Sequence, residues 1–437
     1  GTAYIATTRY KFNDLRPAIY RTTDYGKSWQ KITTGIPKNT YVRVVREDPI
    51  REGLLFAGTE TGMYVSYDTG KQWEPLQLNL PVTPITDLKI HQGDLIVATS
   101  GRSFWVLDDL EALRQFQAET IANRLLQPAD VYRLSARGGM NSNRATGTSS
   151  TTGVNPASGA VIYYELTEEQ AEKGALLQIT TADGEVVRSF SSEKDTDFQS
   201  YAGGPSPEPV IDSKKGLNRF VWNLRHPTLQ GAPKAYLEGS YAGRRVVPGV
   251  YTARLLSLAE DGDESPVEIA DAVSFQVLPH PELDLPLSAY ETQDEMMQAV
   301  GKRINEIHGA VNDLAKLRKR IKERTKDLKQ DKNSNEKLYK IGKGLIKELT
   351  DWESELIQRK SQAYDDVINF PNKLSAEYLF LKGQMDTNTP NVTTPMQERL
   401  KELDTSWLPL KAKQAELLAA IDSFEQALLT AGIKVLR

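Results

Sequence analysis

Two aspartates at equivalent positions of a short repeated pattern are the first candidates for chemistry in this sequence. Asp24 lies in the segment 22–29 and Asp68 in the segment 66–73, and both segments read S/T-x-D-x-G-x-x-W. Two carboxylates can hydrolyse a glycosidic bond when they flank it at a separation of about 5–10 Å. In a hairpin turn, by contrast, the aspartate accepts backbone N–H bonds, the glycine adopts a positive φ and the tryptophan packs over the strands. We predict the second, structural role for both copies, which are Asp24, Gly26 and Trp29, and Asp68, Gly70 and Trp73.

Metal-binding and nucleophilic motifs are the next classes of site to consider. The four histidines, at 91, 226, 280 and 308, are widely separated and lack the spacing of zinc ligands. The sequence contains neither a glycine-rich phosphate loop nor a Gly-x-Ser-x-Gly nucleophile elbow. We therefore expect no metal ion, no cofactor and no catalytic residue in this chain.

Lysine and arginine are concentrated in the segment 316–326, so nucleic-acid binding has to be considered. The segment lacks interleaved aromatic residues, and acidic residues return at Asp327 and Asp331. Single-stranded nucleic acids are usually bound by a basic groove with aromatic side chains, so we expect a solvated helix face instead. The formal net charge of −4 gives no indication of a nucleic-acid partner either. An alternative is that this region projects and docks a protein partner.

The composition limits the covalent chemistry that the chain can perform. It has 437 residues and no cysteine, which excludes disulfides, thiol catalysis and cysteine-ligated zinc within this sequence. The sequence contains no run of about 18 apolar residues that would predict a membrane span, and no signal peptide is recognisable. Residues 1–6 already read as a strand, without cap, turn or leader, so we expect the C-terminal part of a longer protein.

Short apolar runs recur together with the aspartate-containing turns. Two units with a period of about 40–45 residues carry the pattern, and a third follows at 95–109, where Glu111 and Arg114 replace the glycine and the tryptophan. Such turns are called Asp boxes, and this repeat length is typical of β-propeller blades. We predict that residues 1–127 form about three C-terminal blades of a propeller. A closed ring has about 4–8 blades, so the others must come from upstream sequence, a second polypeptide or self-association.

Two further segments precede the C-terminal third of the chain. Residues 128–159 are rich in Gly, Ser, Thr, Asn and Ala and are predicted to be a linker. From 160 to 280, short stretches alternate between apolar and polar residues, with turn residues between them. About seven such strands predict a β-sandwich of immunoglobulin or fibronectin type III.

After Pro286 the apolar period changes from two to about three and a half residues. A first apolar seam, a polar turn at 331–335 and a returning seam predict an antiparallel coiled-coil hairpin. With a third long helix, residues 288–437 are predicted to form an antiparallel α-helical bundle, which makes the fold multidomain, β plus α. The three seams are Val300, Ile304, Ile307, Val311, Leu314, Ile321 and Leu328; Leu338, Ile341, Leu345, Leu349, Trp352 and Leu356; and Leu400, Leu403, Trp407, Leu410, Leu417, Ile421, Phe424 and Leu428.

Several segments, taken together, resemble one family of proteins. They are the two Asp boxes, the run Gly101–Leu110, the strand Asn218–Leu224, the turn Pro248–Tyr251 and the segment Ile368–Leu374. They are similar to large exported bacterial proteins, common in Bacteroidota, with sortilin-like propellers of bacterial neuraminidase (BNR, Asp-box) repeats. The resemblance covers nearly the whole chain, as the C-terminal half of such a protein. It implies export to the periplasm or cell surface and a propeller face that binds peptides, proteins or glycans, but no reaction.

The winding of blades in that family places a ligand face at the loops before each Asp-box hairpin. Tyr10, Glu60 and Arg102 lie in these loops and are the expected ligand contacts, with Tyr10 as a stacking platform and Arg102 as a bidentate partner for a carboxylate. We therefore expect a non-enzymatic binding or scaffold protein whose propeller is completed by its N-terminal remainder. One alternative is a sialidase-like glycoside hydrolase with catalytic residues in the missing blades. Another is a subunit of an outer-membrane assembly that makes contact through the helices.

Overall fold

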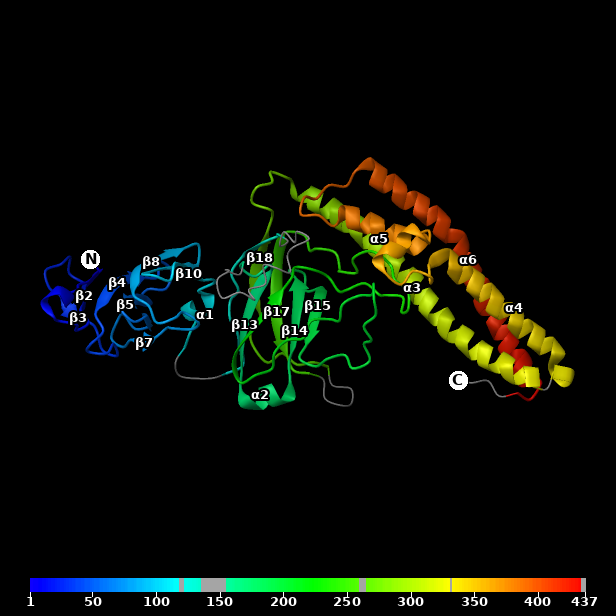
Figure 1. Cartoon of the computed structure of the whole chain (residues 1–437), viewed down its shortest axis with the longest axis horizontal. Helices are drawn as coiled ribbons and strands as arrows, with labels where there is room; N and C mark the ends of the chain where they lie inside the picture. The colour runs from blue at the N-terminus through cyan, green and yellow to red at the C-terminus, as the bar shows by residue number, and fades with distance from the viewer. Residues whose placement is uncertain (118–121, 135–154, 259–264, 331, 434–437) are drawn as a thin grey trace. The chain divides into compact units, whose positions relative to one another are not determined.

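The computed structural model describes residues 1–117, 122–134, 155–258, 265–330 and 332–433. The chain divides into two compact units. The first contains residues 1–117 with 126–129 and 155–156, and the second contains the other described residues. Figure 1 shows the elements from which they are built, which are several antiparallel sheets and, towards the C-terminus, long helices.

Three small antiparallel sheets make up the first unit. They contain three, four and three strands and follow one another along the chain. Aligned on the Asp-box turns, β1, β2 and β3 correspond to β5, β6 and β7, whereas β8, β9 and β10 correspond to β4, β5 and β6. The strands are β1 (Ala3–Ala6), β2 (Ile19–Thr22), β3 (Gln30–Lys31), β4 (Val42–Glu47), β5 (Leu55–Thr59), β6 (Met63–Ser66), β7 (Glu74–Pro75), β8 (Ile85–His91), β9 (Asp94–Thr99) and β10 (Phe104–Leu107).

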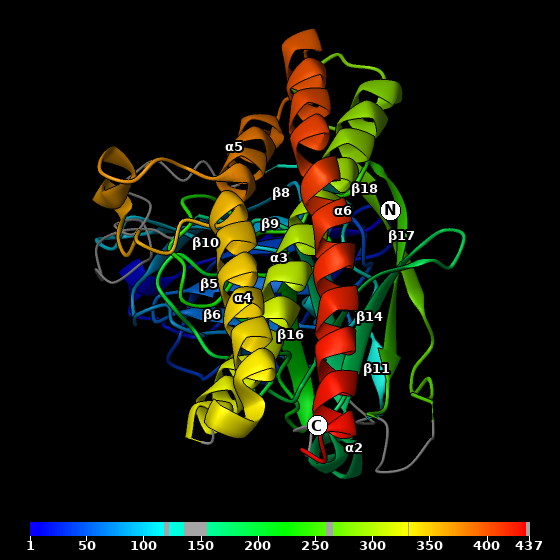
Figure 2. The same cartoon turned by 90° about the vertical axis from the view of Figure 1, so that its right-hand side faces the viewer.

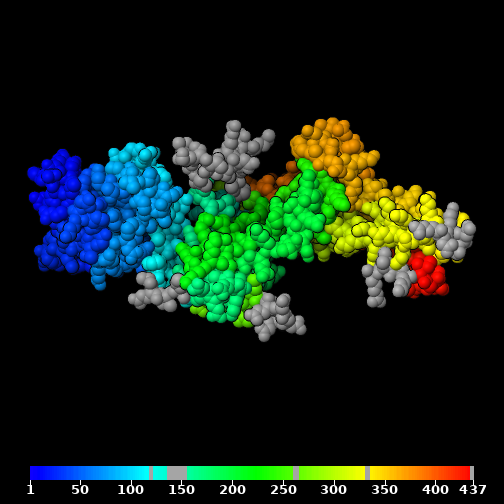
Figure 3. Space-filling model, turned by 60° about the horizontal axis from the view of Figure 1, so that its bottom comes forward, coloured from blue at the N-terminus to red at the C-terminus, as the bar shows by residue number. Residues whose placement is uncertain are grey.

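Apolar side chains of neighbouring sheets share the core of this unit. One buried cluster joins the first sheet to the second through Ile19 and Leu55, and another joins the second to the third through Phe56 and Ile85. Gly58 allows the close approach, because a Cβ built there would lie 2.5 Å from the Ile85 side chain. Figure 3 shows the atoms of this unit, in blue and cyan, as a closely packed body.

The third repeat keeps the aspartate of the box, Asp109, but not its glycine and tryptophan, and it keeps the backbone contact of the turn. The N–H of Leu110 donates to the carbonyl of Gly93 at 2.9 Å, just as the N–H of Thr69 donates to the carbonyl of Gly53 at 2.9 Å in the second repeat. The turn therefore keeps this backbone contact without the glycine and the tryptophan of the box.

A buried ion pair occupies the place of a tryptophan in this third repeat. Arg114, at the end of the one-turn helix α1 (Glu111–Arg114), stands where Trp73 stands in the second. Its Nη2 donates to Asp48 Oδ2 at 2.9 Å, and both side chains are almost wholly buried. Asp48 also accepts the backbone N–H groups of Ile50 and Arg51. The carboxylate therefore fixes both the β4–β5 turn and the end of the third repeat.

We expect Asp48→Ala to destabilise the first unit by about 3–5 kcal/mol, because it removes the buried carboxylate of Arg114, which keeps only the more exposed Glu111, and leaves the N–H groups of Ile50 and Arg51 without their acceptor. The matched control is Asp87→Ala, which removes an exposed partner of Arg46 and should change stability by less than about 1 kcal/mol. Calorimetric unfolding of the full chain measures both. Equal, small losses for the two variants would show that the Arg114–Asp48 pair does not hold the repeat.

Two sheets packed face to face begin the second unit. Their strand orders are β11-β13-β16 and β12-β18-β17-β14-β15, and all strand pairs are antiparallel except β12 with β18. Tyr164, Trp222 and Phe275 meet in the core between them, with the last two rings 6.2 Å apart. The elements are β11 (Arg124–Leu125), β12 (Val131–Tyr132), β13 (Ala160–Leu166), α2 (Glu168–Lys173), β14 (Leu176–Thr181), β15 (Val186–Ser191), β16 (Gly216–Trp222), β17 (Gly249–Leu256) and β18 (Val273–Leu278).

The segment predicted to be a linker, 128–159, contributes to these sheets. Its residues 131 and 132 form β12, which pairs with β18, and residue 160 begins β13. Residues 135–154 of the predicted linker lie outside the described residues. The composition signal therefore missed a short strand, because two residues are too few to show alternation.

Four helices complete the second unit: α3 (Leu287–Gln330), α4 (Lys332–Leu356), α5 (Leu374–Met385) and α6 (Thr394–Thr430). Figure 2 shows α4 and α6 lying side by side next to α3. The predicted seam of α3 is confirmed, since all seven of its apolar residues are buried. One position of the α4 seam was wrong, because Ile341 is 38% exposed. Its neighbour Gly342 takes the inner position, where a Cβ would lie only 2.4 Å from Thr325 Oγ1.

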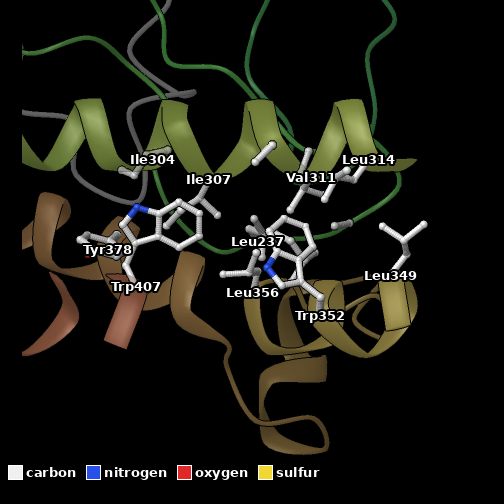
Figure 4. Packing of buried hydrophobic residues seen from close by; sticks show 14 of the residues in the cluster. Leu237, Ile304, Ile307, Val311, Leu314, Leu349, Trp352, Leu356, Tyr378 and Trp407 are labelled. Atoms are coloured by element: carbon white, nitrogen blue, oxygen red, sulfur yellow. The ribbon is translucent and has the colours of Figure 1, made fainter. Parts of the chain in front are cut away.

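A loop between β16 and β17 fills part of the helical core. Ala232, Ala235, Leu237 and Tyr241 are buried in the same apolar cluster as the helix seams. Figure 4 shows Leu237 among side chains of α3 and α4. The loop that connects the two sheets is therefore part of the helical core, while the strands have a buried cluster of their own.

His308 ties this loop to two helices. The ring belongs to α3 and is fully buried. Its Nδ1 lies 2.6 Å from the carbonyl oxygen of Gln230 in the loop, and its Nε2 is hydrogen-bonded to Ser375 Oγ at the start of α5. Burial is the main reason why the pKa of His308 is lowered to about 4.

The lowered pKa predicts a specific pH dependence of stability. Because the unfolded histidine titrates near pH 6.5, stability is fully present above that pH and falls as the pH drops towards 4, by up to about 1.4 kcal/mol per pH unit. Burial also lowers the pKa of His226 to about 4, so the wild-type loss contains both contributions. His308→Gln should be less stable at pH 7.5 and show a shallower loss between pH 6.5 and 5 in denaturant titrations. Parallel pH profiles for the two proteins would contradict this role of His308.

Candidate functional site

The two Asp-box turns have the same hydrogen-bond scheme. In the first, Asp24 Oδ1 accepts from Thr22 Oγ1 at 2.8 Å and from the N–H of Ser28 at 2.9 Å. In the second, Asp68 Oδ1 accepts from Ser66 Oγ at 2.8 Å and from the N–H of Gln72 at 3.0 Å. The glycines at the third position of each turn, Gly26 and Gly70, both have a positive φ of about 85°.

The tryptophans of the two boxes have different environments. Trp73 is buried, and its Nε1 donates to the carbonyl of Ile32 at 2.9 Å, which links the second turn to the first repeat. Trp29 is 41% exposed. A Cβ on Gly70 would lie 2.4 Å from Ile32, so glycine is needed there for packing as well as for its positive φ.

This environment is poorly suited to acid–base chemistry. The hydrogen bonds from the Ser28 side chain and backbone, followed by the bond from Thr22, lower the pKa of Asp24 to about 2. A general acid must instead carry a proton near neutral pH. The geometry of both turns accordingly favours the structural interpretation of the boxes.

Tyr10 and Glu60, two of the three expected ligand contacts, meet at the opposite ends of the strands. Tyr10 begins a single helical turn, Tyr10–Phe12, in the connection between β1 and β2. Glu60 lies in the turn between β5 and β6. The C-terminal end of β6 leads to the Asp68 turn, at the opposite end of the strand. Between Tyr10 and Glu60 stand Tyr41 and Arg43 at the start of β4. We call these four residues the tyrosine–arginine cluster.

Stacking and ion pairing hold this cluster together. The rings of Tyr10 and Tyr41 are stacked, 5.1 Å apart with an interplanar angle of 16°. Arg43 Nε and Nη2 donate to Glu60 Oε2 at 2.8 and 2.6 Å, and Nη2 also donates to the Tyr41 hydroxyl at 3.0 Å. The guanidinium carbon lies 5.3 Å from the Tyr41 ring centre and 6.0 Å from that of Tyr10.

The cluster is fixed on its inner side and open on its outer side. Tyr41 is only 7% exposed, and its burial, followed by its bond to Glu60, raises its pKa, so it remains a neutral phenol. Tyr10 is 41% exposed, and the Arg43 and Glu60 side chains are 29% and 34% exposed. Among the described residues none accepts a bond from Arg43 Nη1. A planar aromatic surface and a cationic donor are thus presented together, an arrangement that suits aromatic or carboxylate-bearing ligands.

Arg102 occupies the corresponding turn of the third repeat, between β9 and β10. Its N–H donates to Thr99 Oγ1 at 3.1 Å, and its carbonyl accepts from Trp105 Nε1 at 2.9 Å. The side chain is exposed, and in the described part of the chain it makes no hydrogen bond or ion pair with the tyrosine–arginine cluster. The structure thus brings Tyr10 and Glu60 together, with Arg102 on a separate turn.

Sequence reasoning missed Tyr41 and Arg43. Tyr41 directly precedes β4 and Arg43 lies at an irregularity of the β4–β5 pairing, so the alternation of a regular strand does not place their side chains. Their proximity to Tyr10 and Glu60 was not readable, because it depends on packing between two repeats.

Serine and histidine side chains in contact raise the question of nucleophilic catalysis. Ser375 and His308 are hydrogen-bonded, but both are fully buried, so no substrate reaches them and the pair instead links two helices. Within the described ranges, no group of three or more His, Cys, Asp or Glu side chains is arranged to hold a metal ion.

Comparison with known proteins places the chain in no family. No family model matches it, and no curated protein matches it. Among solved structures, YCF48 bound to D1 peptide is 22% identical over 21% of this chain and 31% of that one, with a TM-score of 0.18. The extracellular domain of BT4673 from B. thetaiotaomicron is 12% identical over 60% of this chain and 29% of that one, also with a TM-score of 0.18. The chain therefore spans about three tenths of the length of each, and similarities of this strength carry no conclusion about its function.

Proposed function

We propose that this chain is a non-enzymatic binding protein that recognises an extended peptide segment of a partner through its first unit. The observation that carries the proposal is the tyrosine–arginine cluster, in which a half-exposed Tyr10 ring is stacked on a buried ring beside a cation. Exposed aromatic residues backed by rigid partners lose little entropy on binding, and tyrosine and arginine are frequent binding hot spots.

The proposed architecture of the first unit is three blades of a sortilin-like, Asp-box β-propeller. It is supported by the recurrence of equivalent strands and by the same bond scheme in both Asp boxes. In this architecture the boxes fix one end of the first two blades, and the opposite loops with Tyr10, Glu60 and Arg102 form the ligand face. The other blades would come from the N-terminal remainder of the protein.

The charges of the cluster favour a peptide over an anionic sugar. Glu60 already accepts two bonds from Arg43, so the pair is close to neutral and retains limited attraction for an acidic ligand. A peptide can combine an aromatic or apolar side chain over Tyr10 with a neutral backbone carbonyl at Arg43. Glycans that stack on Tyr10 remain the second ligand class to be tested.

The second unit is proposed to act as a spacer and scaffold, with an immunoglobulin-like sandwich and a helical bundle that docks a larger cell-surface or outer-membrane assembly. Export to the periplasm or cell surface is part of the same proposal and rests on the family resemblance of the sequence. No helix in the part of the chain that the structure describes is long and apolar enough to cross a membrane.

Panning a random peptide library on the full chain tests the proposal. We expect a family of related peptides to be enriched, and Tyr10→Ala to weaken their binding at least about fivefold in fluorescence polarisation, which corresponds to about 1 kcal/mol. The matched control is Tyr25→Ala, because Tyr25 is 89% exposed but lies in the Asp-box turn at the other end of the strands. It should bind as the wild type does.

Two results would overturn the peptide proposal. One is that no peptide family is enriched, or that Tyr10→Ala and Tyr25→Ala bind the enriched peptides as tightly as the wild type. The other is binding on a glycan array that depends on Tyr10 while peptides do not bind, which would reassign the same surface to glycans.

A further inference from the structure

A cluster of buried charges lies where the sheets of the second unit meet its helices. Asp386 follows the last residue of α5, and its carboxylate accepts bonds from Arg225 at 2.9 and 3.0 Å and from Arg245 at 3.2 Å. Lys382, one turn earlier in α5, has its Nζ 3.7 Å from the same carboxylate. Arg133, just after β12, completes the set, which we call the junction cluster.

Positive charge is in excess in this cluster. Four cationic side chains, Arg133, Arg225, Arg245 and Lys382, surround the single carboxylate of Asp386. The nearest further carboxylate, Asp294, is paired with its own arginine, Arg244, at 2.6 Å. Three arginines and one lysine around one carboxylate leave positive charge in excess in a region removed from water.

Two of these cations have hydrogen-bond donors without a partner. Arg133 is 3% exposed, and it donates from Nε to the carbonyl of Val246 and from Nη2 to Gln293 Oε1, both at 2.7 Å. Its Nη1 has no hydrogen-bond partner, and neither has Nζ of Lys382, which is 1% exposed. An unsatisfied buried donor on a charged group is destabilising, so such groups usually have an additional partner.

The surroundings lower the proton affinity of the same cations. Burial, followed by the charge of Arg245, lowers the pKa of Arg133 to about 10, and burial lowers the pKa of Lys382. Arg133 remains charged near neutral pH, since a pKa of about 10 lies well above 7. A counter-ion would relieve the repulsion between these groups.

A cavity of about 10 Å³ lies within the junction cluster. It is lined by charged and polar residues and by two methionines: Arg133, Arg245, Gln293, Asp294, Met297, Met385 and Asp386. This volume corresponds to about one water molecule, which excludes phosphate, sulfate and carboxylate ligands. Methionine side chains are flexible and allow the slight widening that a monatomic anion needs.

We infer that this cavity binds one small monatomic anion, chloride under ordinary conditions, in contact with Arg133 Nη1. A water molecule would satisfy the donor without offsetting any of the excess positive charge, whereas a halide accepts the bond and also offsets one positive charge. The carboxylates of Asp294 and Asp386 are engaged by Arg244 and by Arg225 and Arg245, which leaves Arg133 as the side on which the anion rests.

Bromide provides a direct test, because it replaces chloride and gives an anomalous diffraction signal. Crystals of the full chain grown or soaked in sodium bromide should show an anomalous peak within the cavity beside Arg133. An ordered water in the cavity with no bromide peak would overturn the inference.

Thermal unfolding of the full chain gives an independent readout in solution. At constant ionic strength, replacing gluconate by chloride should raise the Tm of the second unit by a few degrees. Lys382→Met removes one of the excess charges and should reduce this shift, whereas Lys401→Met, on the exposed side of α6, should retain it. Equal Tm values in the two salts, or the same chloride response in both variants, would overturn the inference; if Lys382→Met does not fold, the wild-type bromide experiment still decides.

Discussion

The carboxylate of Asp386 is the contact on which the second unit depends. It lies at the C-terminal end of α5, where the helix dipole disfavours a negative charge, and it is buried. Burial alone would raise its pKa, but the charge of Arg225 and the bonds to the arginines hold the pKa below its usual value. Because Arg225 and Arg245 belong to the loop that follows β16, this one group fastens a sheet connection to a helix end.

The first unit depends on a different feature, the Asp-box turn, which occurs twice. In each Asp box the carboxylate satisfies hydroxyl and backbone donors of its own turn, so these polar groups find their partners within the turn itself. With that end of the strands fixed, the connections at the other end can vary in length and composition. The long β1–β2 connection carries Tyr10, whereas the short β5–β6 turn carries Glu60.

Much of the secondary structure could be predicted from the sequence, because it follows from local periodicity. The α3 seam repeats over many turns, and all its members are buried as the period requires. Ile341 fitted the same period but is displaced by Gly342, because the helices approach too closely there for any Cβ. The spacing of apolar residues gives no information about the distance between helices, so the exposure of Ile341 could not be predicted from it.

The tyrosine–arginine cluster and the junction cluster show what local patterns cannot contain. Tyr10 and Tyr41 stack across two repeats, and Arg133 reaches Gln293 across more than half of the second unit's sequence. From the sequence, Arg114 indicated only that the tryptophan of the Asp box is missing in the third repeat. In the structure it forms a buried ion pair with Asp48. Each of these pairs is decided by tertiary packing, and none has a signature in residue spacing.

The loop that inserts Leu237 and Tyr241 among the helices has a consequence for how such a protein can evolve. Domains joined by a linker can be exchanged by recombination, because each retains its own apolar core. Here a recombination break between the sheets and the helices would expose the apolar side chains of this loop and leave a cavity among the helices. The sheets and helices of the second unit must therefore be inherited and exchanged together, as a single genetic module.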